Sequence, residues 1–206
     1  GLLEGKVAIV TGAGGGLGRA HALLLAEHGA CVVVNDLGGA RDGTGSSNSM
    51  ADSVVEEIRA AGGQAAATYG SVSDDDAAKA MVQCAMDNFG RLDILINNAG
   101  ILRDRSFKNM TDAEWDAVIN VHLRGSYLVT KHAWQQMLEQ GEGGRIIMTS
   151  STSGLIGSFG QANYGAAKAG MAGFMRVLAL EGVKYGITVN VLAPAALSRM
   201  TEDLMP

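Results

Sequence analysis

Apolar residues follow two alternating patterns along the chain. Short runs rich in Val and Ile are each followed by a longer stretch in which apolar residues recur every three or four positions. The short runs predict strands at residues 6–11, 31–36, 64–70, 91–100, 144–151 and 187–194. The longer stretches predict helices at residues 18–29, 50–63, 75–90, 111–140 and 161–186. Thr111 and Glu114 form a capping-box signature at the start of the fourth helix.

The order of these elements predicts the fold class. Strands that are apolar on both faces, separated by helices of ten or more residues, are typical of a parallel sheet covered on both sides. Right-handed crossovers then favour a doubly wound sheet, and a closed eight-stranded barrel would need more repeats than the chain has. We predict an α/β fold, a Rossmann-like doubly wound parallel sheet in three α/β/α layers. Residues 1–206 form a single domain in this prediction, and the polar segment 37–49 is a loop within it.

Composition excludes several functional classes. The hydrophobic content of 47% and charged content of 18% are typical of a soluble globular protein, and the net charge of −5 argues against nucleic-acid or anionic-membrane binding. The chain has no secretory signal pattern and no apolar run of transmembrane length, so we expect a cytoplasmic protein. Cys31 and Cys84 cannot form a disulfide framework and are expected to be buried thiols. We expect no metal site.

A glycine-rich stretch, TGAGGGLGRA, follows the first predicted strand. Neither the phosphate-loop pattern GxxxxGK[ST] nor GxGxxG fits, because both, counted from Gly12, require glycine at position 17, which is Leu17. The spacing that fits is Thr11-Gly12-x-x-x-Gly16-x-Gly18. Glycines at these positions would let the backbone approach a pyrophosphate at a helix N-terminus, although a flexible turn is the alternative. The glycines at positions 14 and 15 are expected to tolerate other small residues.

Asp36, at the end of the second predicted strand, bears on the choice of cofactor. A carboxylate there can accept hydrogen bonds from both ribose hydroxyls of an adenosine and would repel a 2′-phosphate. This favours NAD over NADP. Arg19 points the other way, because a basic residue after the glycines could meet a phosphate, and an exposed strand-end role for Asp36 is the alternative.

Three residues in the second half of the chain suit proton chemistry. Tyr164 and Lys168 stand four apart, on one face of a predicted helix, and Ser151 follows the fifth strand. Tyrosine, with a pKa of about 10, is a poor base at neutral pH unless a cation lies beside it. A serine hydroxyl can hold a substrate oxygen whose charge changes. The NNAG segment (97–100) can hydrogen-bond a cofactor and the neighbouring backbone, or form a plain turn.

The glycine loop, NNAG, the serine and YxxxK occur in an order and spacing that resemble the short-chain dehydrogenase/reductase family over the whole chain. The resemblance implies that Ser151, Tyr164 and Lys168 are catalytic, with Tyr164 the general acid/base. His122 stands where most members have asparagine; it could hold a relay water or titrate in the working pH range, or simply be a packed histidine. The implied cofactor-binding residues are Gly12, Gly16, Leu17, Gly18, Asp36, Ser71, Val72, Asn98, Ala99, Gly100, Tyr164, Lys168 and Pro194.

Several longer segments resemble one branch of that family, the (3R)-hydroxyacyl-CoA dehydrogenase domains of peroxisomal multifunctional enzymes and their bacterial relatives. They include VVVNDLGG, NNAGILRDRSF, VHLRGSY, FGQANY and SRMTEDLMP. The resemblance implies NAD-linked oxidation of a (3R)-3-hydroxyacyl-CoA, with a hydroxysteroid or steroid-derived CoA ester as the alternative substrate. A peroxisomal location would follow for a eukaryotic multifunctional enzyme. A non-catalytic NAD-binding regulatory subunit is the alternative from another class.

The resemblance carries two further expectations, and the residues of the RDR segment (103–105) suggest a third. Family members form homodimers or homotetramers through two long helices. They usually continue past this point through a substrate-covering lid and a seventh strand, which we expect this chain to lack. Arg103 and Arg105 could meet the phosphates of a CoA ester, or form surface ion pairs around Asp104.

Overall fold

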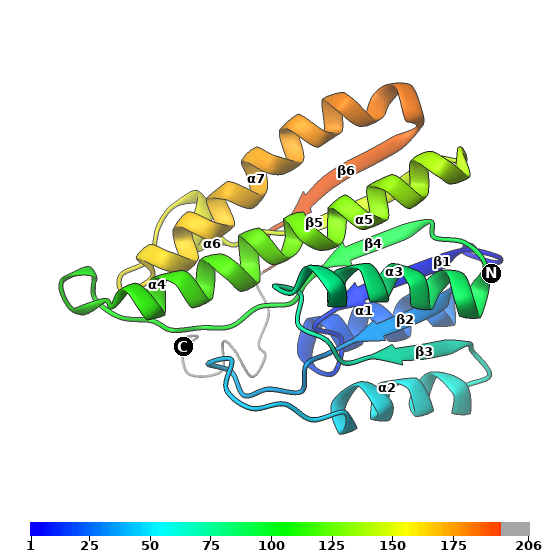
Figure 1. Ribbon diagram of the computed structural model, residues 1–206, viewed down its shortest axis with the longest axis horizontal. Helices are drawn as coiled ribbons and strands as arrows, with labels where there is room; N and C mark the ends of the chain where they lie inside the picture. The colour runs from blue at the N-terminus through cyan, green and yellow to red at the C-terminus, as the bar shows by residue number, and fades with distance from the viewer. Residues whose placement is uncertain (195–206) are drawn as a thin grey trace.

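Six parallel strands form one sheet in the order β3-β2-β1-β4-β5-β6, as the computed structural model shows for residues 1–194 (Figure 1). The strands are β1 (Val7–Thr11), β2 (Cys31–Asn35), β3 (Ala65–Thr68), β4 (Ile94–Asn97), β5 (Gly144–Thr149) and β6 (Ile187–Leu192). The chain starts at the centre of the sheet, moves outward to β3 and then crosses back to β4. Strand order therefore reverses between β1 and β4, where parallel sheets of this kind bind ligands.

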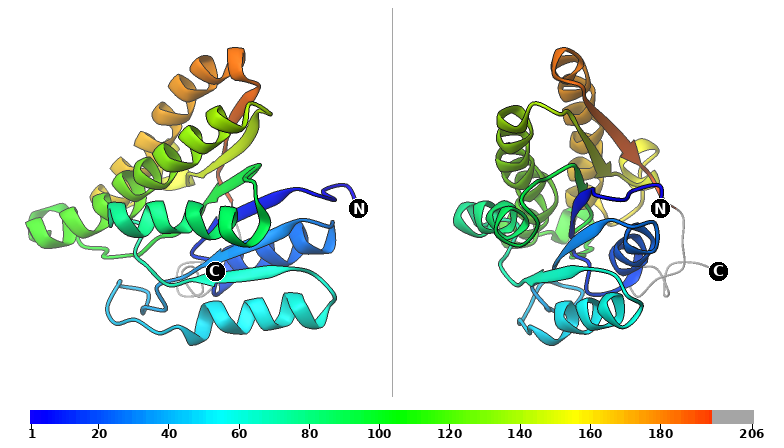
Figure 2. Two further views of the ribbon diagram at one scale, coloured as in Figure 1. Left: turned by 45° about the vertical axis from the view of Figure 1, so that its right-hand side comes forward. Right: turned by 90° about the vertical axis from the view of Figure 1, so that its right-hand side faces the viewer.

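Helices cover both faces of the sheet (Figure 2). On one face, α1 and α2 pack over the even-numbered positions of β1, and on the other α3, α5 and α7 pack over the odd-numbered ones. The helices are α1 (Gly16–Glu27), α2 (Ser49–Ala60), α3 (Asp75–Phe89), α4 (Asp112–Ile119), α5 (Gly125–Gln140), α6 (Thr152–Leu155) and α7 (Ala162–Gly182). Two short 3₁₀ turns are η1 (Phe107–Asn109) and η3 (Val183–Tyr185). The predicted fold class is confirmed.

The predicted helix over 111–140 contains an irregularity that the apolar pattern did not show. Its capping box is present, with Glu114 N–H donating to the Thr111 hydroxyl and Thr111 N–H donating to the Glu114 carboxylate. A π-helical stretch, η2 (Asn120–Arg124), then separates α4 from α5. It places His122 on the buried side of the helix, at the carboxyl end of the sheet.

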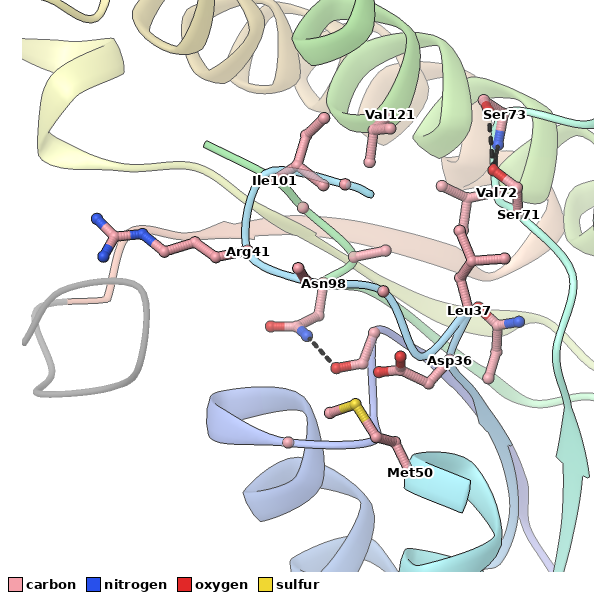
Figure 3. A pocket seen from close by; sticks show the side chains of 18 of the residues that line it. Asp36, Leu37, Arg41, Met50, Ser71, Val72, Ser73, Asn98, Ile101 and Val121 are labelled. Atoms are coloured by element: carbon pink, nitrogen blue, oxygen red, sulfur yellow. Dashed lines mark hydrogen bonds between the residues drawn. The ribbon is translucent and has the colours of Figure 1, made fainter. Parts of the chain in front are cut away.

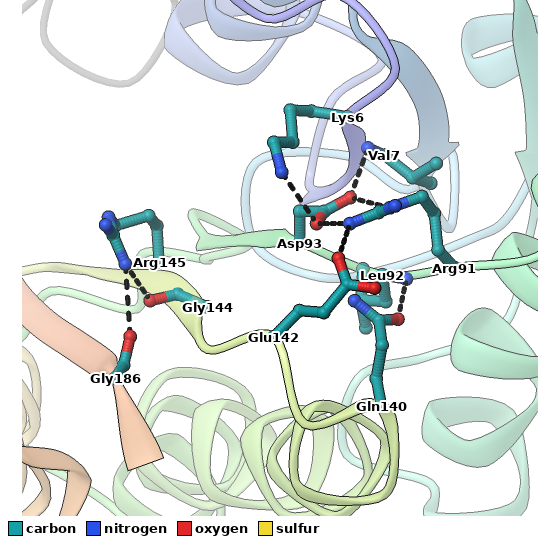
Figure 4. A network of polar contacts seen from close by, with 10 residues as sticks. All are labelled: Lys6, Val7, Arg91, Leu92, Asp93, Gln140, Glu142, Gly144, Arg145 and Gly186. Carbon is teal, nitrogen blue, oxygen red and sulfur yellow. Dashed lines mark hydrogen bonds and ion pairs between the residues drawn. The ribbon is translucent and has the colours of Figure 1, made fainter. Parts of the chain in front are cut away.

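A buried carboxylate fastens the opposite, amino edge of the sheet (Figure 4). Asp93 accepts hydrogen bonds from the Val7 amide at 2.9 Å and from Arg91 at 2.7 and 2.8 Å, and Lys6 lies 3.5 Å away. Arg91 also pairs with Glu142 at 2.6 Å. Burial opposes ionisation of Asp93, but the hydrogen bonds from Arg91 and Val7 prevail and hold its pKa below the ordinary value. This network fixes β1 against β4.

Three other expectations concern what the chain lacks or buries. Among residues 1–194, no helix has the length and apolarity needed to cross a membrane. In the same part of the chain, no cluster of three or more His, Cys, Asp or Glu side chains could hold a metal ion. Cys31 and Cys84 are free thiols, as expected, but both are only partly buried, and burial raises the pKa of each.

Candidate active site

The glycine loop joins β1 to α1 at the point where strand order reverses. Gly12 and Gly16 have φ angles of +62° and +53°, a region that favours glycine. A Cβ on Gly18 would lie 2.2 Å from the Gly12 carbonyl oxygen, and a Cβ on Gly12 would lie 2.7 Å from Ala99 Cα. The backbone therefore requires glycine at all three positions that the spacing selected.

The expectation for the two remaining glycines holds at one and is wrong at the other. Around Gly15 the nearest atom to an added Cβ is Met50 Cε at 3.5 Å, so a small side chain fits. A Cβ on Gly14 would instead lie 2.7 Å from Met50 Cβ and 2.8 Å from Asp36 Oδ2. The Asp36 carboxylate accepts hydrogen bonds from Gly14 N at 2.8 Å and Gly38 N at 2.7 Å. Position 14 requires glycine because the Asp36 carboxylate packs directly against the backbone of the loop there.

The ends of β1 and β4 are cross-linked by hydrogen bonds. Thr11 Oγ1 accepts from the backbone N–H groups of Asn98 and Ala99, each at 3.0 Å. The Asn98 side chain donates to the carbonyl oxygens of Thr11 and Gly12, each at 3.1 Å. Asn98 thus makes the backbone contacts expected of it, and they hold the glycine loop in place.

A pocket of about 420 Å³ opens at the carboxyl ends of β1, β2 and β4 (Figure 3). Most of the predicted cofactor-binding residues line it, and they are Gly12, Gly16, Leu17, Asp36, Ser71, Val72, Asn98, Ala99 and Gly100. Gly18 lies directly against Gly12, beneath the loop. Tyr164, Lys168 and Pro194 are not part of this lining. Pro194 follows the end of β6 and is half-buried.

The loop between β2 and α2 also lines the pocket, which the sequence pattern did not predict. Leu102 N donates to Arg41 O at 3.0 Å, and Arg103 Nε donates to Asp42 O at 2.8 Å. These bonds hold residues 37–43 against the segment that follows β4, and both segments contribute to the pocket wall (Figure 3). A Gly/Ser-rich loop carries no periodic signal, so only the three-dimensional contacts reveal this position.

The RDR segment forms ion pairs, but not around Asp104. Arg105 pairs with Glu114 at 3.0 Å, and the Arg103 guanidinium is held by the Asp42 carbonyl. Asp104 accepts instead from Gln161 Nε2 at 2.8 Å. The two arginines are therefore engaged with other parts of the chain.

Ser151, Tyr164 and Lys168 come together where β5 ends and α7 begins. Lys168 Nζ lies 5.5 Å from the centroid of the Tyr164 ring and donates to Thr149 O at 2.7 Å. Burial lowers the pKa of Lys168 to about 7. For Tyr164, burial raises the pKa, the hydrogen bond with Ser151 lowers it, and the Asp104 charge raises it. The net pKa of Tyr164 is raised in this arrangement, in which Lys168 Nζ is bound to the Thr149 carbonyl.

His122 connects this group to the pocket. Its ring stands perpendicular to that of Tyr164, with centroids 5.1 Å apart, and a Cβ on Gly100 would lie 2.3 Å from His122 Cε1. Nε2 lies 2.8 Å from Ile101 O, and the buried Nδ1 has no hydrogen-bond partner among residues 1–194. Burial and the charge of Lys168 lower the pKa of His122 to about 3. The expectation that it titrates in the working range is wrong, because the buried imidazole stays neutral.

Sequence reasoning missed two buried polar residues beside Tyr164. Asn163 donates to the carbonyl oxygens of Arg103 at 3.0 Å and Glu114 at 3.1 Å, and its Oδ1 accepts from Tyr164 N at 2.7 Å. Gln161 bridges Asp104 and Ser153. Both fall in the predicted helix start, where polar residues are common, so nothing in the pattern marked them.

A glycine turn at the reversal of a parallel sheet, a pocket beside it and a tyrosine next to a buried lysine together define a nicotinamide-dependent oxidoreductase of the Rossmann type. The comparison with known families agrees: the profile of the short chain dehydrogenases matches residues 6–205. The chain belongs to this family and is an oxidoreductase acting on CH–OH groups.

Individual relatives are closely similar. The chain is 56% identical over 203 residues to the peroxisomal multifunctional enzyme type 2 of Mus musculus, covering 98% of this chain and 27% of that protein. It is 47% identical over 213 residues to the hydroxyacyl-CoA dehydrogenase ChsB1 of Mycobacterium tuberculosis, covering 98% of this chain and 64% of that protein. A crystal structure of a short chain dehydrogenase from Mycobacterium avium matches with a TM-score of 0.89 and 52% identity, covering 98% of this chain and 71% of that one.

The SRMTEDLMP segment noted in the sequence lies outside the residues that the structure describes.

Proposed function

We propose that this chain is an NAD-dependent dehydrogenase that oxidises the secondary alcohol of a (3R)-3-hydroxyacyl-CoA. The observation that carries the proposal is the cluster of Ser151, Tyr164 and the buried Lys168, joined through His122 to the pocket at the glycine loop. The similarity to a protein named hydroxyacyl-CoA dehydrogenase supports the substrate class.

The residues of the pocket fit a dinucleotide. α1 begins at Gly16 without a side-chain cap, so the first N–H groups of the helix and its positive dipole end are available to a pyrophosphate. The close contacts at Gly12 and Gly18 keep side chains away from this surface. The glycine loop, Leu17, Ser71, Val72 and the segment Asn98–Gly100 would hold the cofactor.

Two contacts support NAD over NADP. Asp36 places a carboxylate at the end of β2, in the pocket wall, where it would repel a 2′-phosphate. Arg19, which favoured NADP in the sequence, forms a bidentate pair with Glu57 of α2 at 2.6 and 2.7 Å. A guanidinium held by a carboxylate in this way is poorly placed to receive a phosphate.

In the proposed reaction, the bound nicotinamide ring supplies the acceptor for the hydride of the alcohol carbon. Ser151 Oγ accepts from Ser153 N at 3.2 Å and keeps its own proton, which serves the hydrogen bond with Tyr164 in the free protein and can be donated to the substrate oxygen in the proposed reaction. Tyr164 takes the hydroxyl proton of the substrate as the carbon–hydrogen bond breaks.

The tyrosine needs a positive charge beside it, because its pKa is raised in the resting structure. Lys168 lies one helical turn away, and with a pKa of about 7 both its protonated and neutral forms are populated near neutral pH. When protonated, Lys168 places a positive charge beside the Tyr164 ring, and this charge favours the tyrosinate that takes the substrate proton. The unpartnered Nδ1 of His122 suits a hydrogen-bond acceptor for a water at this site.

The outer surface suits self-association through the long helices. Tyr127 on α5 and Val177 and Leu180 on α7 are 48%, 53% and 78% exposed. Apolar side chains gathered on helices in this way favour a homodimer or homotetramer. Light scattering of the purified protein tests this part, and a monomer at micromolar concentration would refute it.

The decisive experiment measures NADH formation by the full-length protein on a panel of 3-hydroxyacyl-CoA esters and hydroxysteroids, with NADP assayed in parallel. The Tyr164→Phe variant should lose turnover and retain NAD binding by fluorescence titration. Tyr185→Phe, at an exposed tyrosine of η3, serves as the matched control and should keep full activity. NAD binding by a parent protein that turns over no substrate would instead support a non-catalytic NAD-binding subunit.

A further inference from the structure

A chain of polar side chains runs along the side of the candidate site, beyond the residues of the proposed mechanism. Asp104 Oδ2 accepts from Gln161 Nε2 at 2.8 Å, and Gln161 Oε1 accepts from the Ser153 hydroxyl at 2.6 Å. The Ser153 amide in turn donates to Ser151 Oγ at 3.2 Å. Gln161 is only 7% exposed. The chain thus joins the segment after β4 to the serine at the end of β5.

The chemistry of the donors fixes the direction of this chain. An ionised carboxylate only accepts, so Gln161 must turn its NH₂ group to Asp104 and its carbonyl to Ser153. The Ser153 hydroxyl must then donate. Ser153 is held at its hydroxyl and at its amide, and Ser151 Oγ is left with its own proton to donate.

The surrounding backbone holds both ends of the chain in place. Arg105 N donates to Gly160 O at 2.8 Å, and a parallel bridge pairs Arg105 with Gln161. A Cβ on Gly154 would lie 2.7 Å from Ala169 N, so α6 packs directly on α7. The carboxylate of Asp104 is not shared with its neighbours, because Arg103 is held by Asp42 and Arg105 by Glu114.

We propose that Asp104, Gln161 and Ser153 are positioning residues for the reaction: the chain orients the Ser151 hydroxyl toward the substrate oxygen, and the charge of Asp104 tunes the ionisation of Tyr164. This inference rests on the proposed function for the role of Ser151. The effect of the Asp104 charge on Tyr164 is a property of the protein alone, and it can be measured whether or not the protein turns over a substrate.

The sign of the charge effect follows from the groups that face Tyr164. Asp104, in the segment after β4, is bound to Gln161, three residues before Tyr164. Lys168 lies on the next turn of α7, and the His122 ring of η2 stands against the Tyr164 ring. His122 is neutral, because its pKa is lowered to about 3. The negative charge of Asp104 raises the pKa of Tyr164, so Asp104→Asn should lower that pKa.

The charge is tested by an ultraviolet titration of tyrosinate in the full protein without substrate. The signal of Tyr164 is obtained by subtracting the Tyr164→Phe titration in each background. Asp104→Asn should move the Tyr164 midpoint to lower pH, and the control Asp116→Asn, at an exposed aspartate of α4, should leave it in place. Equal midpoints in the parent and Asp104→Asn would overturn this half, whether or not the protein turns over a substrate.

The positioning role is tested by kcat for NADH formation. Ser153→Ala removes the hydroxyl that bonds Gln161 and keeps the amide that bonds Ser151, so kcat should fall about two- to tenfold, the range for one lost hydrogen bond. The dissociation constant for NAD should stay the same, and the control Thr152→Ala, at the exposed neighbouring hydroxyl, should keep full kcat.

Each outcome of these two experiments is informative. Equal kcat in Ser153→Ala and Thr152→Ala overturns the positioning role. If Asp104→Asn does not fold, Gln161→Glu tests the charge, because a second carboxylate facing Asp104 should raise the Tyr164 midpoint; an unchanged midpoint overturns it. Absence of turnover in the parent contradicts the proposed function and, with it, the role of Ser151. The titration still decides whether Asp104 tunes Tyr164.

Discussion

Replacing Lys168 by methionine should abolish activity and stabilise the folded chain below neutral pH. Lys168 is 3% exposed, and its one hydrogen bond runs to the Thr149 carbonyl. Its pKa falls from an ordinary 10.5 to about 7 because burial disfavours the ammonium. A difference of this size corresponds to about 5 kcal/mol of folding free energy at a pH where both folded and unfolded chains carry the charge.

The pH dependence follows from which state binds the proton. Below about pH 7 the ammonium is present in both states, and the whole cost of burying it is felt. Between about pH 7 and 10.5 the folded chain has released the proton while the unfolded chain retains it, so the stability of the parent rises with pH. Methionine carries no charge, and its advantage should shrink over the same window.

The expected size allows for what methionine loses. The Thr149 carbonyl is left without its donor, at a cost of about 1–2 kcal/mol. The Lys168→Met variant should therefore exceed the parent by about 3 kcal/mol in unfolding free energy at pH 6 and show no advantage near pH 10.

Urea unfolding followed by circular dichroism at pH 6, 8 and 10 measures these differences. Lys79→Met, at an exposed lysine of α3, is the matched control and should show no pH-dependent difference. A Lys168→Met variant that is less stable than the parent by the same amount at every pH would refute the buried-charge reasoning.

Three other changes test different parts of the structure. Asp93→Asn should lower the unfolding free energy by about 2 kcal/mol at pH 7, because it breaks a buried ion pair; since the folded pKa of Asp93 is lowered, the deficit should disappear in urea melts as the pH falls below about 4. Gly14→Ala should destabilise the protein by about 1–3 kcal/mol and weaken NAD binding through its clash with Asp36, whereas Gly15→Ala should do neither in the same thermal melts and titrations. His122→Ala should leave the pH–rate profile of NADH formation in place between pH 5 and 8, because the imidazole stays neutral there; a lost inflection in that range would contradict the assignment.

The sequence predicted the sheet well because its strands are buried on both faces. Runs such as residues 31–35 are nearly continuous in β-branched residues, and a parallel central strand needs that pattern. The predicted fourth strand was too long, since only Ile94–Asn97 pairs with its neighbours. Asp93, before this strand, accepts a hydrogen bond from Val7 N, and Asn98 N, after it, donates to Thr11 Oγ1. The hydrophobic pattern of the sequence does not predict such contacts.

The candidate site could be predicted only where a position carries its own chemical signature. Gly12 and Gly16 are marked by spacing and confirmed by positive φ angles. The need for glycine at position 14 depends on Asp36, which is distant in sequence, and the sequence alone gave no reason to expect that contact. The pKa of His122 depends on complete burial beside Lys168, which is likewise a property of the fold.

The two edges of the sheet differ in a way that connects stability to chemistry. At the amino edge, Asp93 has its hydrogen bonds satisfied by Arg91 and the Val7 amide. At the carboxyl edge, by contrast, Lys168 is buried with a depressed pKa, and the nearby His122 Nδ1 and Thr149 Oγ1 have no partner within the described chain. Unpaired buried polar atoms are costly, and the amino edge also has one, at Gln140 Nε2. The amino-edge network offsets part of that cost, and the carboxyl edge keeps a lysine that exchanges protons near neutral pH, as hydride chemistry on an alcohol requires.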